Sequence, residues 1–196
     1  IRNVQSFGLP VIVAINAFPG DTEAEWQLIR EQALAAGASA AIVHHGFTEG
    51  GQGTAQLAQA VVDACEQKER PDFRFSYELE QELPEKIRAL ACGLYGAQDI
   101  DLDPIAVRKL KKYQELGYGK LPVCIAKTHL SISHDPSLRG APTGYRFPIR
   151  DIRLSAGAGF VYALAGDIRT MPGLPSRPGF MDIDLDPQSG GIIGLS

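Results

Sequence analysis

The chain has 196 residues, of which 44% are hydrophobic and 21% are charged, and its formal net charge is −4. This length allows one large domain or two small domains with proper cores, and the mildly acidic balance without a Lys/Arg cluster argues against nucleic acid and anionic membranes as partners. No apolar run approaches the roughly 20 residues of a membrane-spanning helix, so we expect a cytoplasmic protein that acts on small molecules.

The cysteines and histidines predict neither a disulfide framework nor a metal site. Cys65, Cys92 and Cys124 are widely spaced and odd in number, so we expect buried free thiols. His44 and His45 are adjacent and would point to opposite faces of an extended segment. The other two histidines lie far along the chain, so we expect no metal.

The chain begins with apolar residues at helical spacing, Ile1, Val4 and Phe7, and it has no initiator Met. We therefore expect that it starts inside a helix and is a piece of a longer protein whose other part lies upstream.

The segment from Gly8 to Trp26 predicts one buried strand that leads through a loop into a helix. Residues 11–15 are short, β-branched and unalternating, which is typical of a central parallel strand covered on both faces. Residues 16–20 break the strand, and Asp21 or Thr22 can cap the helix. In the loop, Phe18 and Pro19 either tuck into the core or offer a flat surface to a ligand.

A second strand follows this helix and places another aromatic residue near Phe18. We expect the helix over residues 21–36, with Gly37 as its left-handed cap, and the strand over residues 40–44. The expected inward residues of the helix are Trp26, Ile29, Ala33 and Leu34. A right-handed crossover makes the two strands parallel, so the loop after the second strand opens at the same edge as the first loop. Phe18 and Phe47 are therefore predicted to face one crevice.

The middle of the chain predicts three further helices and one strand. They cover residues 54–69, 73–77 (the strand), 84–96 and 103–117. The glycine-rich segment 50–53 could bind an anion at the first helix start, but without a P-loop lysine such a segment is more often a tight turn.

From Leu121 the pattern becomes strand-rich. We expect strands over residues 123–126, 145–154 with an irregularity at Pro148, and 160–165, and a closing hairpin about residues 187–190. The predicted fold class is therefore α/β, with a parallel-strand crossover domain over residues 1–120 followed by a smaller mixed, strand-rich domain over residues 121–196.

Two cations are candidates for substrate contacts. Lys127 follows the predicted strand over residues 123–126, where it could bind a phosphate or a carboxylate, although a solvated lysine at a strand end is equally compatible with the pattern. Arg169 lies in a loop rich in Gly and Pro and has the same two interpretations, with the rigid prolines favouring a shaped ligand loop.

Six collinear segments resemble the carboxyl-terminal part of the formate tetrahydrofolate ligase family, also called 10-formyltetrahydrofolate synthetase. They are FGLPVIVAINAFPGDTEAE, TEGGQG, KIRALACGLYGAQDIDLDPIA, LPVCIAKTHLSISHDP, GAPTGYRFPIRDIRLSAGAGF and GDIRTMPGLPSRP. Together they span essentially the whole chain.

The resemblance implies a reaction in which ATP phosphorylates formate to formyl phosphate and tetrahydrofolate accepts the formyl group to give 10-formyltetrahydrofolate. It also implies that ATP and Mg are bound mainly by an amino-terminal P-loop domain missing here, that a monovalent cation can be a further cofactor, and that the intact protein is a homo-oligomer. The fragment alone is expected to be inactive. In the family the pterin ring is clamped at the positions of Phe18, Pro19 and Phe47, with Val43 at the aliphatic wall, and many members are expected to carry Trp at position 47.

Two other interpretations follow from the same sequence. The chain could be a noncatalytic folate-binding or assembly module derived from that scaffold, because the P-loop is absent and Phe replaces Trp at position 47. A nicotinamide-binding dehydrogenase domain rests on fold class alone, and no GxGxxG fingerprint follows the first strand.

Overall fold

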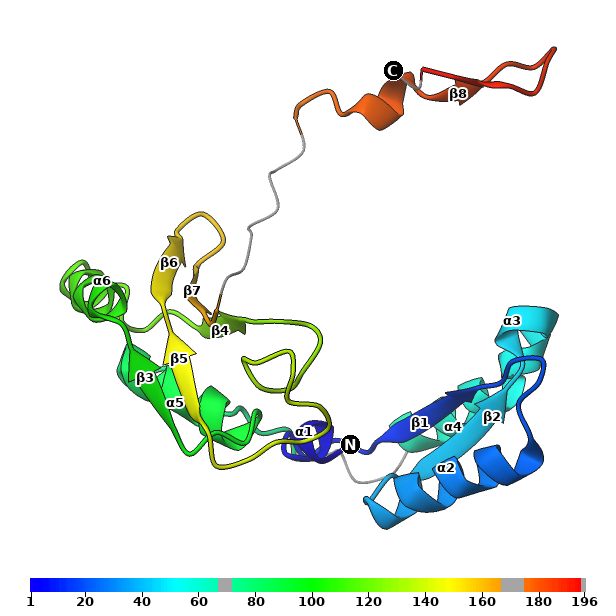
Figure 1. The fold of residues 1–196 in the computed structure, drawn as a ribbon, viewed down its shortest axis with the longest axis horizontal. Helices are drawn as coiled ribbons and strands as arrows, with labels where there is room; N and C mark the ends of the chain where they lie inside the picture. The colour runs from blue at the N-terminus through cyan, green and yellow to red at the C-terminus, as the bar shows by residue number, and fades with distance from the viewer. Residues whose placement is uncertain (67–71, 167–174, 195–196) are drawn as a thin grey trace. The chain divides into compact units, whose positions relative to one another are not determined.

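The computed structural model describes residues 1–66, 72–166 and 175–194, which fall into two compact units, Ile1–Gly166 and Asp167–Ser196. Helices and several small sheets make the fold mixed α/β (Figure 1). The first unit opens with α1 (Arg2–Gln5).

A parallel strand pair is the scaffold of the amino-terminal region. β1 (Ile12–Asn16) and β2 (Ala40–His44) pair in parallel, as the sequence predicts, and α2 (Glu23–Ala35) connects them. Both α2 and α4 (Ala55–Cys65) pack on the pair (Figure 1). In the part of the chain that the structure describes, β1 has a neighbouring strand on one side only, so the expected central position of β1 is not found there.

Helix α2 has the predicted start and end. The Thr22 hydroxyl accepts a hydrogen bond from the Glu25 backbone N–H, and the Glu25 carboxylate accepts one from the Thr22 backbone N–H. These two hydrogen bonds form a capping box. Gly37 ends the helix with φ of +97°. The expected inward face was partly wrong, because Ile29 and Leu34 are 46% and 47% exposed. Two strands are too narrow to cover the whole apolar stripe of the helix, and they bury Ala33 but leave these two side chains outside.

The rest of the first unit surrounds one larger core. It contains α5 (Leu83–Gly93), β3 (Asp99–Leu102), α6 (Pro104–Glu115), β4 (Val123–Ala126), β5 (Arg146–Ile149), β6 (Asp151–Ser155) and β7 (Phe160–Leu164). β3 pairs in parallel with β5, and a separate sheet has the order β4-β7-β6. The core takes residues from both sides of the expected boundary at residues 120 and 121, for example Ile87 and Val161. That boundary stays a prediction.

The expected strand over residues 73–77 is not formed. Instead, the Tyr77 hydroxyl accepts a hydrogen bond from the Val123 backbone N–H at 2.7 Å and donates one to the Val123 carbonyl at 2.9 Å. The Tyr77 side chain therefore satisfies the backbone N–H and carbonyl of Val123 at the edge of β4. Because these groups are already bonded, the backbone of residues 73–77 does not pair with β4 as a strand.

The expected single strand over residues 145–154 is two strands. β5 ends at Ile149 and pairs with β3, whereas β6 begins at Asp151 and pairs antiparallel with β7. The chain changes partner at Arg150, whose backbone N–H bonds the Leu164 carbonyl at 2.9 Å. The irregularity therefore lies two residues after Pro148.

The second unit contains the expected hairpin. Its described elements are η2 (Gly179–Asp182), β8 (Asp184–Leu185) and β9 (Ile192–Ile193), and the two strands pair antiparallel. The three cysteines are free, as predicted, but Cys65 and Cys124 are exposed and not buried. Cys65 lies on an exposed face of α4, and Cys124 lies on an exposed face of β4. A position in a helix or a strand does not by itself bury a side chain.

Candidate functional site

The loop after β1 presents Phe18 at the carboxyl end of the strand. The Asp21 N–H bonds the Phe18 carbonyl at 3.1 Å, and Gly20 has φ of +106°. Pro followed by a glycine with positive φ is the pattern of a type II turn. This tight turn leaves Phe18 and Pro19 exposed instead of folding them into the core.

The loop after β2 presents Phe47 in the same way. Phe47 lies on α3 (Gly46–Glu49), a single helical turn that ends at Gly50, and its side chain is 70% exposed. The segment then continues as η1 (Gln52–Thr54) into α4, so residues 50–53 form a turn and a 3₁₀ helix start.

The two aromatic rings meet, as the parallel topology predicts. The ring centroids of Phe18 and Phe47 are 5.4 Å apart, and the ring planes are inclined at 49°. Two stacking contacts of about 3.5 Å each would require about 7 Å between rings that enclose a flat heterocycle. A flat ligand can therefore enter between them only if the pair opens by one or two ångströms.

Polar and aromatic contacts behind the rings were not expected from the sequence as part of the site. Asp21 Oδ2 accepts hydrogen bonds from the Phe18 N–H at 2.8 Å and from Trp26 Nε1 at 3.4 Å. The Trp26 ring lies edge-on to His45, with centroids 5.7 Å apart. The spacing of Asp21 in the sequence fits a helix cap equally well, so no local signal separates the two roles.

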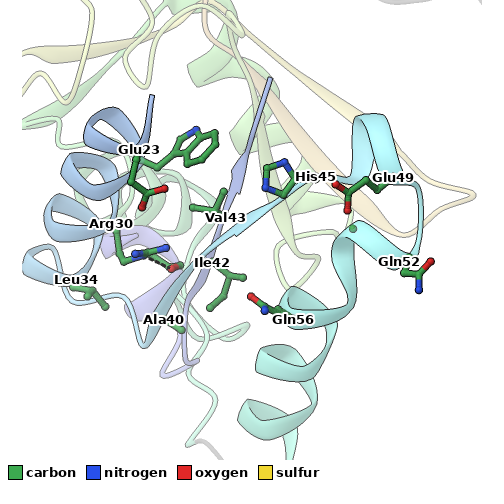
Figure 2. Close-up of a pocket in the computed structure, with 13 residues that line it drawn as sticks. Glu23, Arg30, Leu34, Ala40, Ile42, Val43, His45, Glu49, Gln52 and Gln56 are labelled. Atoms are coloured by element: carbon green, nitrogen blue, oxygen red, sulfur yellow. Dashed lines mark hydrogen bonds between the residues drawn. The ribbon is translucent and has the colours of Figure 1, made fainter. Parts of the chain in front are cut away.

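A cavity of about 690 Å³ lies along β2 (Figure 2). It is lined by residues of α2, β2, α3, η1 and the start of α4 and by His45, and Val43 is among the β2 residues. Neither Phe18 nor Phe47 is among its lining residues. Arg30 Nε donates to the Ala41 carbonyl at 3.3 Å, so the guanidinium satisfies a backbone acceptor of β2 (Figure 2).

Val43, which is predicted to form the aliphatic wall, is partly buried and packs against the small core of Ile15, Ala33, Ala38 and Ala41. The same side chain borders the cavity beside β2. Because its neighbours in that core are fixed by both strands and α2, Val43 offers a rigid apolar surface.

The Lys127 side chain forms hydrogen bonds within the loop that follows β4. Its Nζ donates to the carbonyls of Thr128 and Ser131 and lies 5.3 Å from the centre of the Tyr95 ring. Burial lowers the pKa of this lysine below its ordinary value. The predicted substrate contact of Lys127 stays a prediction, and the predicted contact of Arg169 lies outside the described residues.

The described residues contain no group of three or more His, Cys, Asp or Glu side chains placed to hold a metal ion. They also contain no helix long and apolar enough to cross a membrane.

Comparison with known proteins gives the family. A sequence model described as formate–tetrahydrofolate ligase matches residues 1–196. The chain belongs to this family. It is 52% identical over 196 residues to a formate–tetrahydrofolate ligase of Roseiflexus castenholzii, covering all of this chain and 34% of that relative.

Longer relatives share the same segment. The chain is 48% identical over 196 residues to a cytoplasmic C-1-tetrahydrofolate synthase of Schizosaccharomyces pombe and 47% identical over 195 residues to a mitochondrial C-1-tetrahydrofolate synthase of Saccharomyces cerevisiae. These matches cover all of this chain but 21% and 20% of the two relatives. The chain therefore spans 34% of the ligase relative's length and a smaller share of the two synthases.

Proposed function

We propose that this chain is the carboxyl-terminal, folate-binding portion of an ATP-dependent formate–tetrahydrofolate ligase. The observation that carries the proposal is the contact between Phe18 and Phe47 at the carboxyl ends of two parallel strands, where α/β proteins bind ligands. Two exposed aromatic rings from separate loops offer the faces that a pterin ring would stack on.

The proposed substrate site comprises six residues. Phe18 and Phe47 stack on the two faces of the pterin and exclude water from them, and Pro19 extends the flat surface beside Phe18. Val43 supplies the aliphatic wall. Lys127 and Arg169 are proposed as contacts for the anionic groups of the substrates.

The proposed reaction has two steps. A formate oxygen attacks the γ-phosphorus of ATP, which gives formyl phosphate and ADP. The amine nitrogen of tetrahydrofolate then attacks the formyl carbon, phosphate leaves with the C–O bonding electrons, and the nitrogen loses a proton to give 10-formyltetrahydrofolate. ATP and Mg are assigned to a P-loop domain outside this chain, as the family resemblance implies. The intact enzyme is proposed to be a cytoplasmic homo-oligomer, and a monovalent cation is a further proposed cofactor.

The test measures product formation by the full-length polypeptide that carries this chain, with ATP, formate and tetrahydrofolate. We expect 10-formyltetrahydrofolate, and we expect Phe18→Ala and Phe47→Ala to raise the KM for tetrahydrofolate without changing the KM for ATP. Phe180→Ala, which truncates an aromatic side chain of similar exposure in the second unit, is the matched control.

The outcomes separate the two parts of the proposal. A folded wild-type enzyme that makes no product but binds tetrahydrofolate in calorimetry would favour the noncatalytic module. Product formation with an unchanged KM for tetrahydrofolate in both variants would instead reject the aromatic clamp.

A further inference from the structure

We propose that Asp21, acting with Trp26, is a positioning residue that sets the geometry of the Phe18 and Phe47 pair. This inference rests on the proposed folate site. Asp21 lies between the first ring and the helix that follows it, and its carboxylate links the backbone of one loop to an aromatic contact with the other loop.

The first link fixes the Phe18 side. Asp21 Oδ2 accepts the Phe18 N–H at 2.8 Å, while the Asp21 N–H donates to the Phe18 carbonyl at 3.1 Å. The two hydrogen bonds join the same two residues in both directions, and the first of them is charge-assisted and therefore stronger than a neutral one. They hold the backbone from which the Phe18 ring projects.

The second link reaches the Phe47 side. Trp26 Nε1 donates to the same carboxylate oxygen at 3.4 Å, and the indole lies edge-on to His45 at 82° between ring planes. The His45 carbonyl accepts the N–H groups of Thr48 and Glu49 at 3.1 Å and 2.8 Å, which forms the turn that carries Phe47. The indole therefore packs against the residue whose carbonyl forms the turn that carries Phe47.

Helix α2 does not need Asp21 for its start. The cap is supplied by Thr22 and Glu25, whose side chains bond each other's backbone N–H groups. Removing the Asp21 carboxylate therefore leaves the capping box in place. A substitution of Asp21 should therefore alter the geometry of the Phe18 and Phe47 pair without unfolding the start of α2.

The consequence for binding follows from preorganisation. Rings that are held at a fixed spacing lose less conformational freedom when a pterin enters, so the contacts behind them increase affinity without touching the substrate. Because these contacts do not reach the reacting atoms, they should alter the KM for tetrahydrofolate and leave kcat unchanged.

The experiment uses the full-length enzyme and measures kcat, the KM for each substrate and the melting temperature. We expect Asp21→Ala to raise the KM for tetrahydrofolate about tenfold, the size expected from loss of one charge-assisted hydrogen bond. Asp21→Asn keeps an oxygen that can accept the Phe18 N–H and should restore much of the loss. Trp26→Phe keeps a ring against His45 but removes the indole donor, so it should raise the same KM by a smaller factor.

Glu31→Ala is the matched control, because Glu31 is an exposed carboxylate on the nearby helix α2 and accepts a hydrogen bond from Gln27 Nε2 at 2.8 Å. A fall in kcat and melting temperature with an unchanged KM for tetrahydrofolate would overturn the positioning role, because it would mean that Asp21 only supports folding. A KM for tetrahydrofolate that is as high in Asp21→Asn as in Asp21→Ala would also contradict the positioning role. If the wild-type enzyme forms no product at all, the proposed function fails first, and this inference fails with it.

Discussion

The rings of Phe18 and Phe47 touch in the structure, with centroids 5.4 Å apart, although the two residues belong to loops separated by a helix and a strand. The parallel pairing of β1 and β2 explains the contact, because it brings the carboxyl ends of both strands to one edge. The rings are too close for a flat ligand to lie between them, and their planes are inclined. The size of the side chain at position 47 and the flexibility of the turn that carries it should therefore both affect ligand entry.

Phe47→Trp should strengthen tetrahydrofolate binding. Phe47 is mostly exposed, so a larger ring can be accommodated, and its greater stacking area is worth about 1 kcal/mol, or about fivefold in affinity. Calorimetric titration of the full-length enzyme measures the change. Phe180→Trp is the control for nonspecific association with an added indole. Weaker binding by Phe47→Trp would indicate that the site is sized for phenylalanine.

The turn that carries Phe47 should tolerate a methyl group at Gly51 but not at Gly50. Gly50 has φ of +59° and ψ of −140°, a conformation that an L side chain avoids at a cost of about 1–3 kcal/mol. Gly51 has φ of −61° and ψ of −30°, and a Cβ there would meet no atom within 4 Å. Gly50→Ala should therefore raise the KM for tetrahydrofolate several-fold, whereas Gly51→Ala should stay close to wild type. Equal effects of the two substitutions would contradict this assignment of the turn.

The parts of the fold that the sequence predicts well are those with a local cause. The strand over residues 40–44, the cap at Thr22 and the turn at Gly37 each follow from neighbouring residues. The meeting of Phe18 and Phe47 needs one further rule, that a strand, helix and strand pair in parallel, and the structure confirms it.

The parts that the sequence does not predict depend on distant partners. The segment over residues 73–77 alternates like a strand, but Tyr77 bonds the edge of β4 with its side chain, 46 residues away. Likewise, nothing local shows that β5 and β6 join different sheets. At the site, Asp21 fits a helix cap by its spacing, and only the folded loop shows that its carboxylate binds Phe18 and Trp26 instead.

Asp99 should make the stability of the chain depend on acid pH. Its carboxylate accepts from Arg88 Nε at 2.9 Å and from the Ile100 N–H at 2.8 Å, and these hydrogen bonds lower the pKa of Asp99 below its ordinary 3.8. A carboxyl with a lowered pKa in the folded state contributes stability above the unfolded pKa, and this stability is lost as the pH falls through the folded pKa. Asp99→Asn should therefore be less stable than wild type at pH 6 and approach it below pH 3.8.

Urea unfolding at several pH values measures this difference. Asp103→Asn, which makes the same change at the exposed N-cap of α6, is the control variant. A constant difference between wild type and Asp99→Asn across the acid range would show that the substitution acts by packing and not by charge.

Lys86 should be needed for stability, even though it is a charged side chain inside the core. It is fully buried, and its Nζ donates to the carbonyls of Gly119 at 2.8 Å and Leu121 at 3.1 Å, which fixes the segment between α6 and β4. Burial lowers the pKa of Lys86, against the field of Glu80 and Glu82, so the ammonium has a desolvation cost. Replacement by methionine removes that cost but leaves two carbonyls without their donor, at about 1–3 kcal/mol each.

The lost donors should outweigh the relieved desolvation, because two acceptors depend on one group and the carboxylates offset part of its cost. We therefore expect Lys86→Met to lower the free energy of unfolding by about 2 kcal/mol, with an unchanged denaturant slope. Lys112→Met makes the same change at an exposed position of α6 and should have little effect. If Lys86→Met were as stable as the control variant, the desolvation of the ammonium would be the larger quantity, and Lys86 would hold the geometry of the segment without a net gain in stability.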